Sequence, residues 1–263
     1  MSKQFSKVIG CICILLASFF HSASAEEIDL QLFETSFYSP NGEDGIFARL
    51  FSLIKTTPIR FCVECGANDG ITNSLTYLLR NQGWRALLLD RSFDIPSISL
   101  HKEFLTAENV NALFEKYSVP KSFDLMTIDT GSNDFYIWKA LDERYCPSVV
   151  CIAYNGLHKP EEDKVVQYHP FFCGDETSYF GASILALYNL GRSKHYALVY
   201  AEESGRHLFF VREDLLRDNH LVFKNANDVR ELYRPPTYEK AQGKQRHDPK
   251  NRPHLSSKEL LKK

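Results

Sequence analysis

The sequence predicts a single α/β domain, built on a mostly parallel β-sheet with an antiparallel hairpin at its C-terminal end. Between residues 59 and 190, short apolar runs typical of buried strands alternate with runs typical of helices. This alternation favours parallel strands joined by helices that cover both faces of the sheet. Two further strand-like runs flank Glu203-Ser204-Gly205, a turn signal that predicts the hairpin. A hydrophobic share of 44% is ordinary for a globular domain.

The individual elements follow from local patterns. Pro58 and Gly66 bound the first apolar run, and Leu75, Leu78 and Leu79 share one face of the first predicted helix. Strands are expected at 59–65, 85–90, 123–129, 148–154, 195–201 and 207–211. Helices are expected at 72–81, 110–117, 135–141 and 181–190.

The first 25 residues predict a cleaved signal peptide. Lys3 and Lys7 precede an apolar run at 8–20, and Ala23-Ser24-Ala25 provides a small-residue cleavage site before Glu26. The apolar run is shorter than the roughly 20 residues that span a bilayer, so an uncleaved anchor is the less favoured alternative. We therefore expect an exported protein, periplasmic or secreted, with no membrane span after cleavage. A formal net charge of −2 gives no electrostatic reason to expect binding to nucleic acid.

The cysteine pattern predicts free, buried thiols rather than a disulfide framework or a metal site. Of the seven cysteines, two lie in the signal peptide and five remain. Cys62 and Cys65 stand three positions apart in the first predicted strand, where their side chains point to opposite faces about 10 Å apart. That separation is beyond the reach of a disulfide. A zinc site would need a second pair of ligands, and no such pair accompanies them.

The most informative motif is E-C-G-A-N-D-G at 64–70, directly after the first strand. Gly66 permits a tight turn, and Gly70 is expected to keep the start of the following helix open to a ligand. Asp90 ends the next strand, 20 residues after Gly70. A carboxylate at that position can accept hydrogen bonds from both hydroxyl groups of an adenosine ribose.

The spacing of this motif favours S-adenosylmethionine over a nicotinamide dinucleotide. Nicotinamide dinucleotides are typically bound by a G-x-G-x-x-G motif, in which the closely spaced glycines leave room for a pyrophosphate. Here Glu64 precedes a G-x-x-x-G turn, where it would repel a pyrophosphate but could bind the ammonium group of methionine, directly or through water. The residues predicted to hold the cofactor are Glu64, Gly66, Asn68, Gly70 and Asp90. A glycine turn without any ligand remains the alternative.

From about Asn41 to Asp214 the chain resembles the FkbM-type S-adenosylmethionine-dependent methyltransferases and their poorly characterised relatives. The matching motifs, in order, are E-D-G-I at 43–46, E-C-G-A-N-D-G at 64–70, N-S at 73–74, G-W at 83–84, the strand ending at Asp90, F-D-L-M-T-I-D at 123–129, N-D-F-Y-I-W at 133–138, A-Y-N at 153–155, F-G-A-S at 180–183 and F-F-V-R at 209–212. The resemblance implies a seven-stranded, Rossmann-like methyltransferase sheet with the cofactor over the ends of its first strands. It further implies O-methyl transfer to a small or carbohydrate-like acceptor.

Three positions depart from the family pattern, among them Ser132 in place of a glycine. Where family members tend to read D-x-D-G-N-D, this chain has Gly131 in place of the middle acid, and where many relatives read E-Y-N it has Ala153. The loss of two acids weakens a divalent-metal site or a carboxylate base at these strand ends. Asp129, Asp134 and Asn155 remain as candidate catalytic residues, with Asp129 near the methionine part or the acceptor. His158 is a further polar candidate, or an ordinary loop histidine.

Two functions are compatible with these residues. The first is an exported methyltransferase that positions the methyl group of S-adenosylmethionine in line with an acceptor oxygen. The second is a catalytically degenerate relative that acts as a secreted binding or interaction module. Gly131 and Ala153 favour the second function, and so does export, because S-adenosylmethionine is made in the cytosol.

The chain is expected to divide into the signal peptide at 1–25, one Rossmann-like methyltransferase domain at 26–233 and a basic tail at 234–263. The tail carries nine Lys and Arg residues against three acids, has four prolines and is almost free of apolar residues. This composition predicts a flexible, solvated segment. A weak electrostatic contact with an acidic partner is the alternative.

Overall fold

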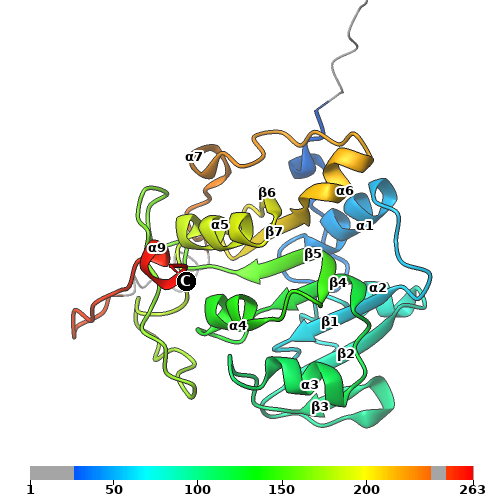
Figure 1. The fold of residues 1–263 in the computed structure, drawn as a ribbon, viewed down its shortest axis with the longest axis horizontal. Helices are drawn as coiled ribbons and strands as arrows, with labels where there is room; N and C mark the ends of the chain where they lie inside the picture. The colour runs from blue at the N-terminus through cyan, green and yellow to red at the C-terminus, as the bar shows by residue number, and fades with distance from the viewer. Residues whose placement is uncertain (1–26, 238–246, 263) are drawn as a thin grey trace, which may run out of the picture.

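The computed structural model describes residues 27–237 and 247–262, so the predicted signal peptide lies outside the described residues. A seven-stranded sheet forms the centre of the molecule, in the order β3-β2-β1-β4-β5-β7-β6 (Figure 1). The strands are β1 (Phe61–Cys65), β2 (Arg85–Asp90), β3 (Leu100–Lys102), β4 (Ser122–Ile128), β5 (Cys146–Ala153), β6 (Tyr196–Ala201) and β7 (His207–Arg212).

Strand directions confirm the predicted fold class. Strands β1 to β5 pair in parallel, and β7 runs antiparallel to both of its neighbours, β5 and β6. The sheet is therefore mostly parallel, with the antiparallel hairpin at its C-terminal end that the sequence predicts. Strand order reverses between β1 and β4, and in such sheets ligands bind beyond the carboxyl ends of the strands at this switch point.

Helices cover both faces of the sheet. The α-helices are α1 (Glu43–Leu53), α2 (Tyr77–Asn81), α3 (Val110–Lys116), α4 (Asp134–Ala140), α5 (Ile184–Ser193), α6 (Glu213–Asp218), α7 (Val229–Leu232) and α9 (Ser257–Leu260), and the 3-10 helices are η1 (Leu30–Phe33) and η2 (Pro96–Ile98). Buried side chains of α3, α4 and α5 form one core cluster, and those of α1 and α2 join a second cluster on the other face. Within the described residues, no helix has the length and apolar character needed to cross a membrane.

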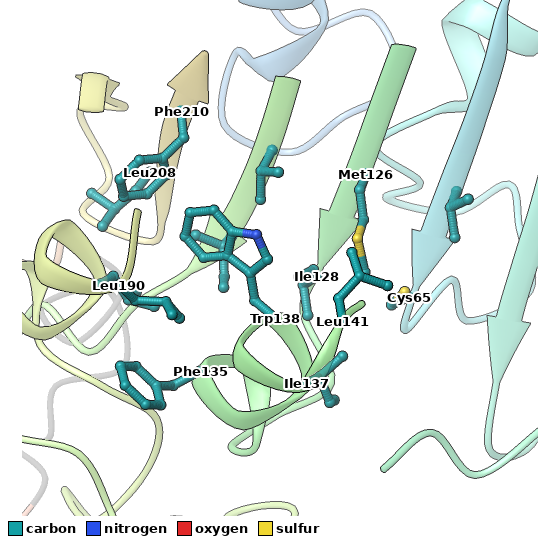
Figure 2. Close-up of a cluster of buried hydrophobic side chains, with 14 of the residues drawn as sticks. Cys65, Met126, Ile128, Phe135, Ile137, Trp138, Leu141, Leu190, Leu208 and Phe210 are labelled. Atoms are coloured by element: carbon teal, nitrogen blue, oxygen red, sulfur yellow. The ribbon is translucent and has the colours of Figure 1, made fainter. Parts of the chain in front are cut away.

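The core confirms the predicted placement of the cysteine pair. Cys65 packs among Met126 and the side chains of α4 (Figure 2), whereas Cys62 belongs to the cluster on the opposite face. Both thiols are buried and free. In the same cluster as Cys65, the Trp138 ring packs against the Phe210 ring in a tilted arrangement, with ring centroids 4.9 Å apart. The pair of cysteines is therefore part of the packing of β1.

The first predicted helix is shorter in the structure than in the prediction. Instead of spanning 72–81, α2 begins at Tyr77, and residues 66–76 form a loop. The carboxylate of Glu64 accepts hydrogen bonds from the Leu75 backbone and the Ser74 and Thr76 hydroxyls, which holds these residues outside the helix. The other predicted elements are present, most of them with shifted ends. The structure adds elements that were not predicted: α1, β3, α6, α7, α9, η1 and η2.

Residues 247–262 pack onto the domain, so the expectation of a solvated tail is wrong for this segment. The backbones of Leu255 and Val165 exchange two hydrogen bonds, of 2.9 and 2.8 Å. Next to them, Asp163 accepts hydrogen bonds from the Ser256 hydroxyl and the Ser257 backbone. Composition predicts solvation because the segment is polar, but several of its polar groups have partners on the domain. Residues 238–246 of the predicted tail lie outside the described residues.

Candidate functional site

Three adjoining cavities lie at the carboxyl ends of the parallel strands, and Asp129 and Arg206 line all of them. The Asp90 cavity, of about 240 Å³, is lined among others by Gly66, Asn68, Leu89, Asp90, Phe104 and Leu105. The Asp134 cavity, of about 440 Å³, is lined among others by Arg91, Asp134, Ala153, Asp175, Thr177 and Phe180. The His207 cavity, of about 170 Å³, is lined among others by Asn41, Glu64, Asn73, Thr127 and His207.

The turn after β1 requires its first glycine. Gly66 has a φ of +89°, and a Cβ atom on it would lie 2.0 Å from the backbone oxygen of Asp129. The β1 turn therefore lies directly against the end of β4. Asn68 is also left-handed, with a φ of +49°, and its N–H donates to Oδ2 of Asp90 over 2.9 Å. The predicted residues Gly66, Asn68 and Asp90 thus meet in one cavity.

Asp90 combines a structural and a ligand-facing position. Besides the Asn68 N–H, its carboxylate accepts the N–H groups of Ser92 and Phe93, over 2.8 and 3.3 Å. These bonds fix the turn after β2. Because a carboxylate has about four acceptor sites and Oδ1 already accepts two hydrogen bonds, about one site is left, on Oδ2. Since Asp90 also lines the cavity, it can accept a hydrogen bond from a ligand.

Gly70 lies apart from the three cavities. A Cβ atom here would come within 2.9 Å of Ile98 Cδ1 and 3.1 Å of Leu88 Cδ1. Gly70 therefore lets the loop pack on β2 and η2, and the helix that it was expected to open begins only at Tyr77. Gly70 was expected to leave room for a ligand at the start of a helix. This reason is wrong, because the atoms closest to Gly70 belong to the side chains of Ile98 and Leu88.

Glu64 points toward the loop before α2. It is 3% exposed, and its oxygens accept hydrogen bonds from Leu75 N (2.7 Å), Ser74 Oγ (2.8 Å) and Thr76 Oγ1 (2.5 Å). Burial raises the pKa of Glu64 and outweighs these bonds. The side chain still lines the His207 cavity. Its clearest role is to shape the loop, and its predicted role toward an ammonium group stays a prediction.

A buried ionic network joins Asp129 to helix α1. His207 Nδ1 lies 2.8 Å from Glu43 Oε1, and its Nε2 lies 3.5 Å from Asp129 Oδ2. Arg206 donates to the same oxygen of Asp129 over 2.8 Å. Burial disfavours the charged form of His207, but the two carboxylates outweigh it and raise the pKa of His207 above its usual range. His207 is therefore a buried cation at neutral pH.

The two predicted catalytic acids differ in protonation. Burial opposes the charge on Asp129, but His207 and Arg206 outweigh it and hold the pKa of Asp129 well below its usual range. In contrast, burial and the nearby charge of Asp129 raise the pKa of Asp134 to about 7, although Thr130 donates to it from its backbone (2.6 Å) and hydroxyl (2.9 Å). Both acids line the Asp134 cavity, so one stays ionised while the other can exchange a proton near neutral pH.

Asn155, the third candidate, is fully buried beside the Asp134 cavity. Its amide donates to the backbone oxygens of Ser178 (3.0 Å) and Phe180 (2.8 Å), and its side-chain oxygen accepts the Leu157 N–H. These bonds hold the loop that walls the cavity. His158 packs on the His254 ring, and burial lowers the pKa of His158 to about 4. The loop histidine interpretation fits this placement.

A side chain in place of Gly131 would be strained and in close contact with Cys173. Gly131 has a φ of +99°, and a Cβ atom on it would lie 3.0 Å from the backbone oxygen of Cys173. An aspartate here would need a left-handed backbone and a small shift of Cys173. Ala153, another departure, lines the Asp134 cavity and leaves it without a carboxylate at that point.

Sequence reasoning missed four residues of the site: Glu43, Arg91, Arg206 and His207. Glu43 belongs to the E-D-G-I motif, but its partner His207 is 164 residues away. No local pattern pairs residues over that distance. Arg91 directly follows Asp90, and Arg206-His207 follow the hairpin turn, so their positions at the ends of strands are the signals that could have found them.

No protein-family model matches the chain, and no curated protein matches it significantly. Among solved structures, 22 chains match. One is the crystal structure of CalO1, described as a methyltransferase in calicheamicin biosynthesis in its SAH-bound form. The match has 16% sequence identity and a TM-score of 0.34, and it covers 65% of this chain and 56% of that one.

Proposed function

We propose that the protein binds S-adenosylmethionine and transfers its methyl group to an oxygen of a small or carbohydrate-like acceptor. The observation that carries the proposal is the meeting of Asp90 with the turn at Gly66 and Asn68 in one cavity. This cavity lies where the strand order reverses, beside the carboxyl ends of β1, β2 and β4.

The residues of the Asp90 cavity fit an adenosine without phosphates. Asp90 has an acceptor site left on Oδ2 for a ribose hydroxyl, and Leu89, Phe104 and Leu105 supply apolar surface for a base. Asp90, Glu103 and Asp129 line the cavity together with Arg91 and Arg206, so the lining has no excess of positive charge to favour a pyrophosphate. The ordered motifs that resemble FkbM-type methyltransferases support the same cofactor.

The Asp134 cavity fits the acceptor. When bound, S-adenosylmethionine supplies a methyl group that an oxygen nucleophile can attack. Asp134, with a pKa raised to about 7, is suited to take the proton from an acceptor hydroxyl, because a base works best near the operating pH. Asp129 stays ionised through His207 and Arg206 and holds the end of β4 in place.

The alternative is a binding module with this fold and no catalysis. Its supporting observation is at Gly131, where the left-handed backbone and the close Cys173 backbone oxygen disfavour the family's middle acid. In this alternative the protein does not transfer a methyl group. The Asp90 cavity then either still binds the cofactor or no longer binds it.

Calorimetry of the purified protein tests the proposal. We expect S-adenosylhomocysteine and S-adenosylmethionine to bind and NAD to give no heat at the same concentration. Release of S-adenosylhomocysteine in the presence of hydroxyl-bearing acceptors then distinguishes an enzyme from a binding module. Absence of binding at millimolar S-adenosylhomocysteine contradicts both the cofactor and the reaction.

A further inference from the structure

The Asp90 and Asp134 cavities meet at a junction, which we define by the residues that line both of them. These residues are Arg91, Asp129, Gly131, Cys173 and Arg206. In the proposed reaction a methyl group passes from a cofactor in the first cavity to an acceptor in the second. An acceptor therefore has to reach the junction in order to react.

The junction has three charged side chains, and two of them are paired with each other. Arg206 donates to Asp129 Oδ2 over 2.8 Å, so this guanidinium and this carboxylate offset each other. Arg91 is exposed, and its side chain makes no hydrogen bond or ion pair within the part of the chain that the structure describes. The junction is therefore left with one positive charge that the protein does not offset.

The other carboxylates of the two cavities do not supply the missing counter-charge. Glu103 and Asp175 are each paired with a basic side chain outside the cavities, over 2.6 and 2.8 Å. Asp90 accepts three backbone N–H groups, and Asp134 is held near its titration point by burial. Glu176 lines the Asp134 cavity but not the Asp90 cavity, so it does not belong to the junction.

The proposed cofactor does not explain a cation at this place. The methyl group of S-adenosylmethionine is carried by a sulfonium, which is itself positive, and like charges repel each other. An anionic group on the acceptor is attracted to both charges. A guanidinium suits such a group, because it binds a carboxylate or a phosphate through two parallel N–H donors.

We propose that Arg91 binds an anionic group of the acceptor, so that the substrates are hydroxyl compounds that carry a carboxylate or a phosphate, such as uronic acids or sugar phosphates. The inference rests on the proposed function, because it takes the Asp134 cavity as the acceptor site. Arg91 is then a residue that determines specificity. It holds the acceptor at the junction, where Asp134 takes the proton of the hydroxyl group.

Three sugars that differ only at C6 test this inference by calorimetry, on protein saturated with S-adenosylhomocysteine. D-glucuronate has a carboxylate at C6, D-glucose 6-phosphate has a phosphate ester there, and D-glucose has neither. We expect wild-type protein to bind at least one of the acids about tenfold more tightly than D-glucose, because the effect of Arg91 should lie between that of an exposed ion pair and that of a hydrogen bond to a charged group. The acid that binds more tightly identifies the anion. Arg91→Gln is expected to lose the preference and to keep its affinity for S-adenosylhomocysteine.

Arg85→Gln is the matched control, because it removes the same charge from an exposed position at the other end of β2. This variant is expected to keep the preference for the acid. Wild-type protein that binds S-adenosylhomocysteine but prefers neither acid overturns the inference, and so does a preference that survives in Arg91→Gln or is lost in Arg85→Gln. If Arg91→Gln instead loses affinity for S-adenosylhomocysteine, the arginine belongs to the cofactor site and the inference is wrong. Wild-type protein that does not bind S-adenosylhomocysteine contradicts the proposed function itself.

Discussion

Two carboxylates at the end of β4 and the start of α4 hold different protonation states in one cavity. Asp129 is ionised because two cations contact it, and Asp134 is held near its titration point because it is buried beside Asp129. Because their pKa values are shifted in opposite directions, Asp134 is the candidate base. It also couples the protonation of the site to the stability of the domain.

The raised pKa of Asp134 predicts a pH-dependent stability. Between pH 3.8, the ordinary pKa of the group, and about 7, the unfolded chain has lost this proton while the folded domain retains it. The contribution of Asp134 therefore destabilises the fold increasingly as pH rises through that window. Asp134→Asn lacks this titration, so we expect its unfolding free energy relative to wild type to rise from about pH 4 to about pH 8. Urea unfolding at both pH values measures it. The exposed Asp218→Asn is the control, and a difference that stays constant with pH contradicts the assignment.

Single residues were predictable where chemistry follows a local pattern. Asp90 and Gly66 were found because each ends a strand at a fixed spacing, and the structure brings them together. Asn155 was chosen for the same reason, but its amide is used by backbone oxygens of a loop that the sequence does not place. His207 was missed because its charge depends on Glu43, whose proximity is set by tertiary packing.

At the scale of elements, the C-terminal segment and the loop that walls the Asp134 cavity depend on each other. The guanidinium of Arg252 lies 4.1 Å from the Tyr179 ring centroid, pairs with Asp175 over 2.8 Å and donates to Thr177 Oγ1 over 2.8 Å. Asp175 and Thr177 line the cavity. A segment remote in sequence therefore holds the wall of the Asp134 cavity.

Arg252→Ala is expected to loosen this wall and spare the cofactor cavity. Without the guanidinium, the backbone N–H groups at 175–181 should exchange with solvent deuterium faster, because local opening becomes easier. Binding of S-adenosylhomocysteine should stay unchanged, since Arg252 does not line the Asp90 cavity. The exposed Arg217→Ala serves as the matched control. Equal exchange rates in wild type and Arg252→Ala contradict the role given to the segment.

Elements were predictable in proportion to their apolar patterns. The strands β1, β2, β4 and β5 are continuous buried runs, and each was found. Strand β3 has only three residues, too few for a periodic signal. The start of α2 was misplaced because a buried carboxylate, rather than helix propensity, organises residues 74–76. The packed C-terminal segment was missed because its contacts are polar.

At the scale of the whole molecule, the alternation of strands and helices was enough to predict the sheet. The reversal of strand order between β1 and β4 follows from that topology and places the site. The topology does not determine where the protein is localised. The inference on localisation rests on residues 1–25, which lie outside the described residues.

We infer export from the basic residues, apolar run and small-residue site at 1–25. N-terminal sequencing of the protein recovered outside the cytoplasm should begin at or near Glu26. Full-length protein with Met1 intact in a cytosolic fraction contradicts export. Either result leaves the cofactor site open to the same tests.

The central claim is that Asp90 holds the ribose of S-adenosylmethionine, and titration of two variants with S-adenosylhomocysteine tests it most directly. Asp69→Ala is the matched control, because Asp69 accepts the Ile71 and Thr72 N–H groups in the same loop but lines none of the three cavities. Both variants lose hydrogen bonds that shape turns, so both should be less stable than wild type. We expect Asp90→Ala to weaken binding by about ten- to a hundredfold and Asp69→Ala to leave it unchanged. Equal affinity in wild type and Asp90→Ala contradicts the claim.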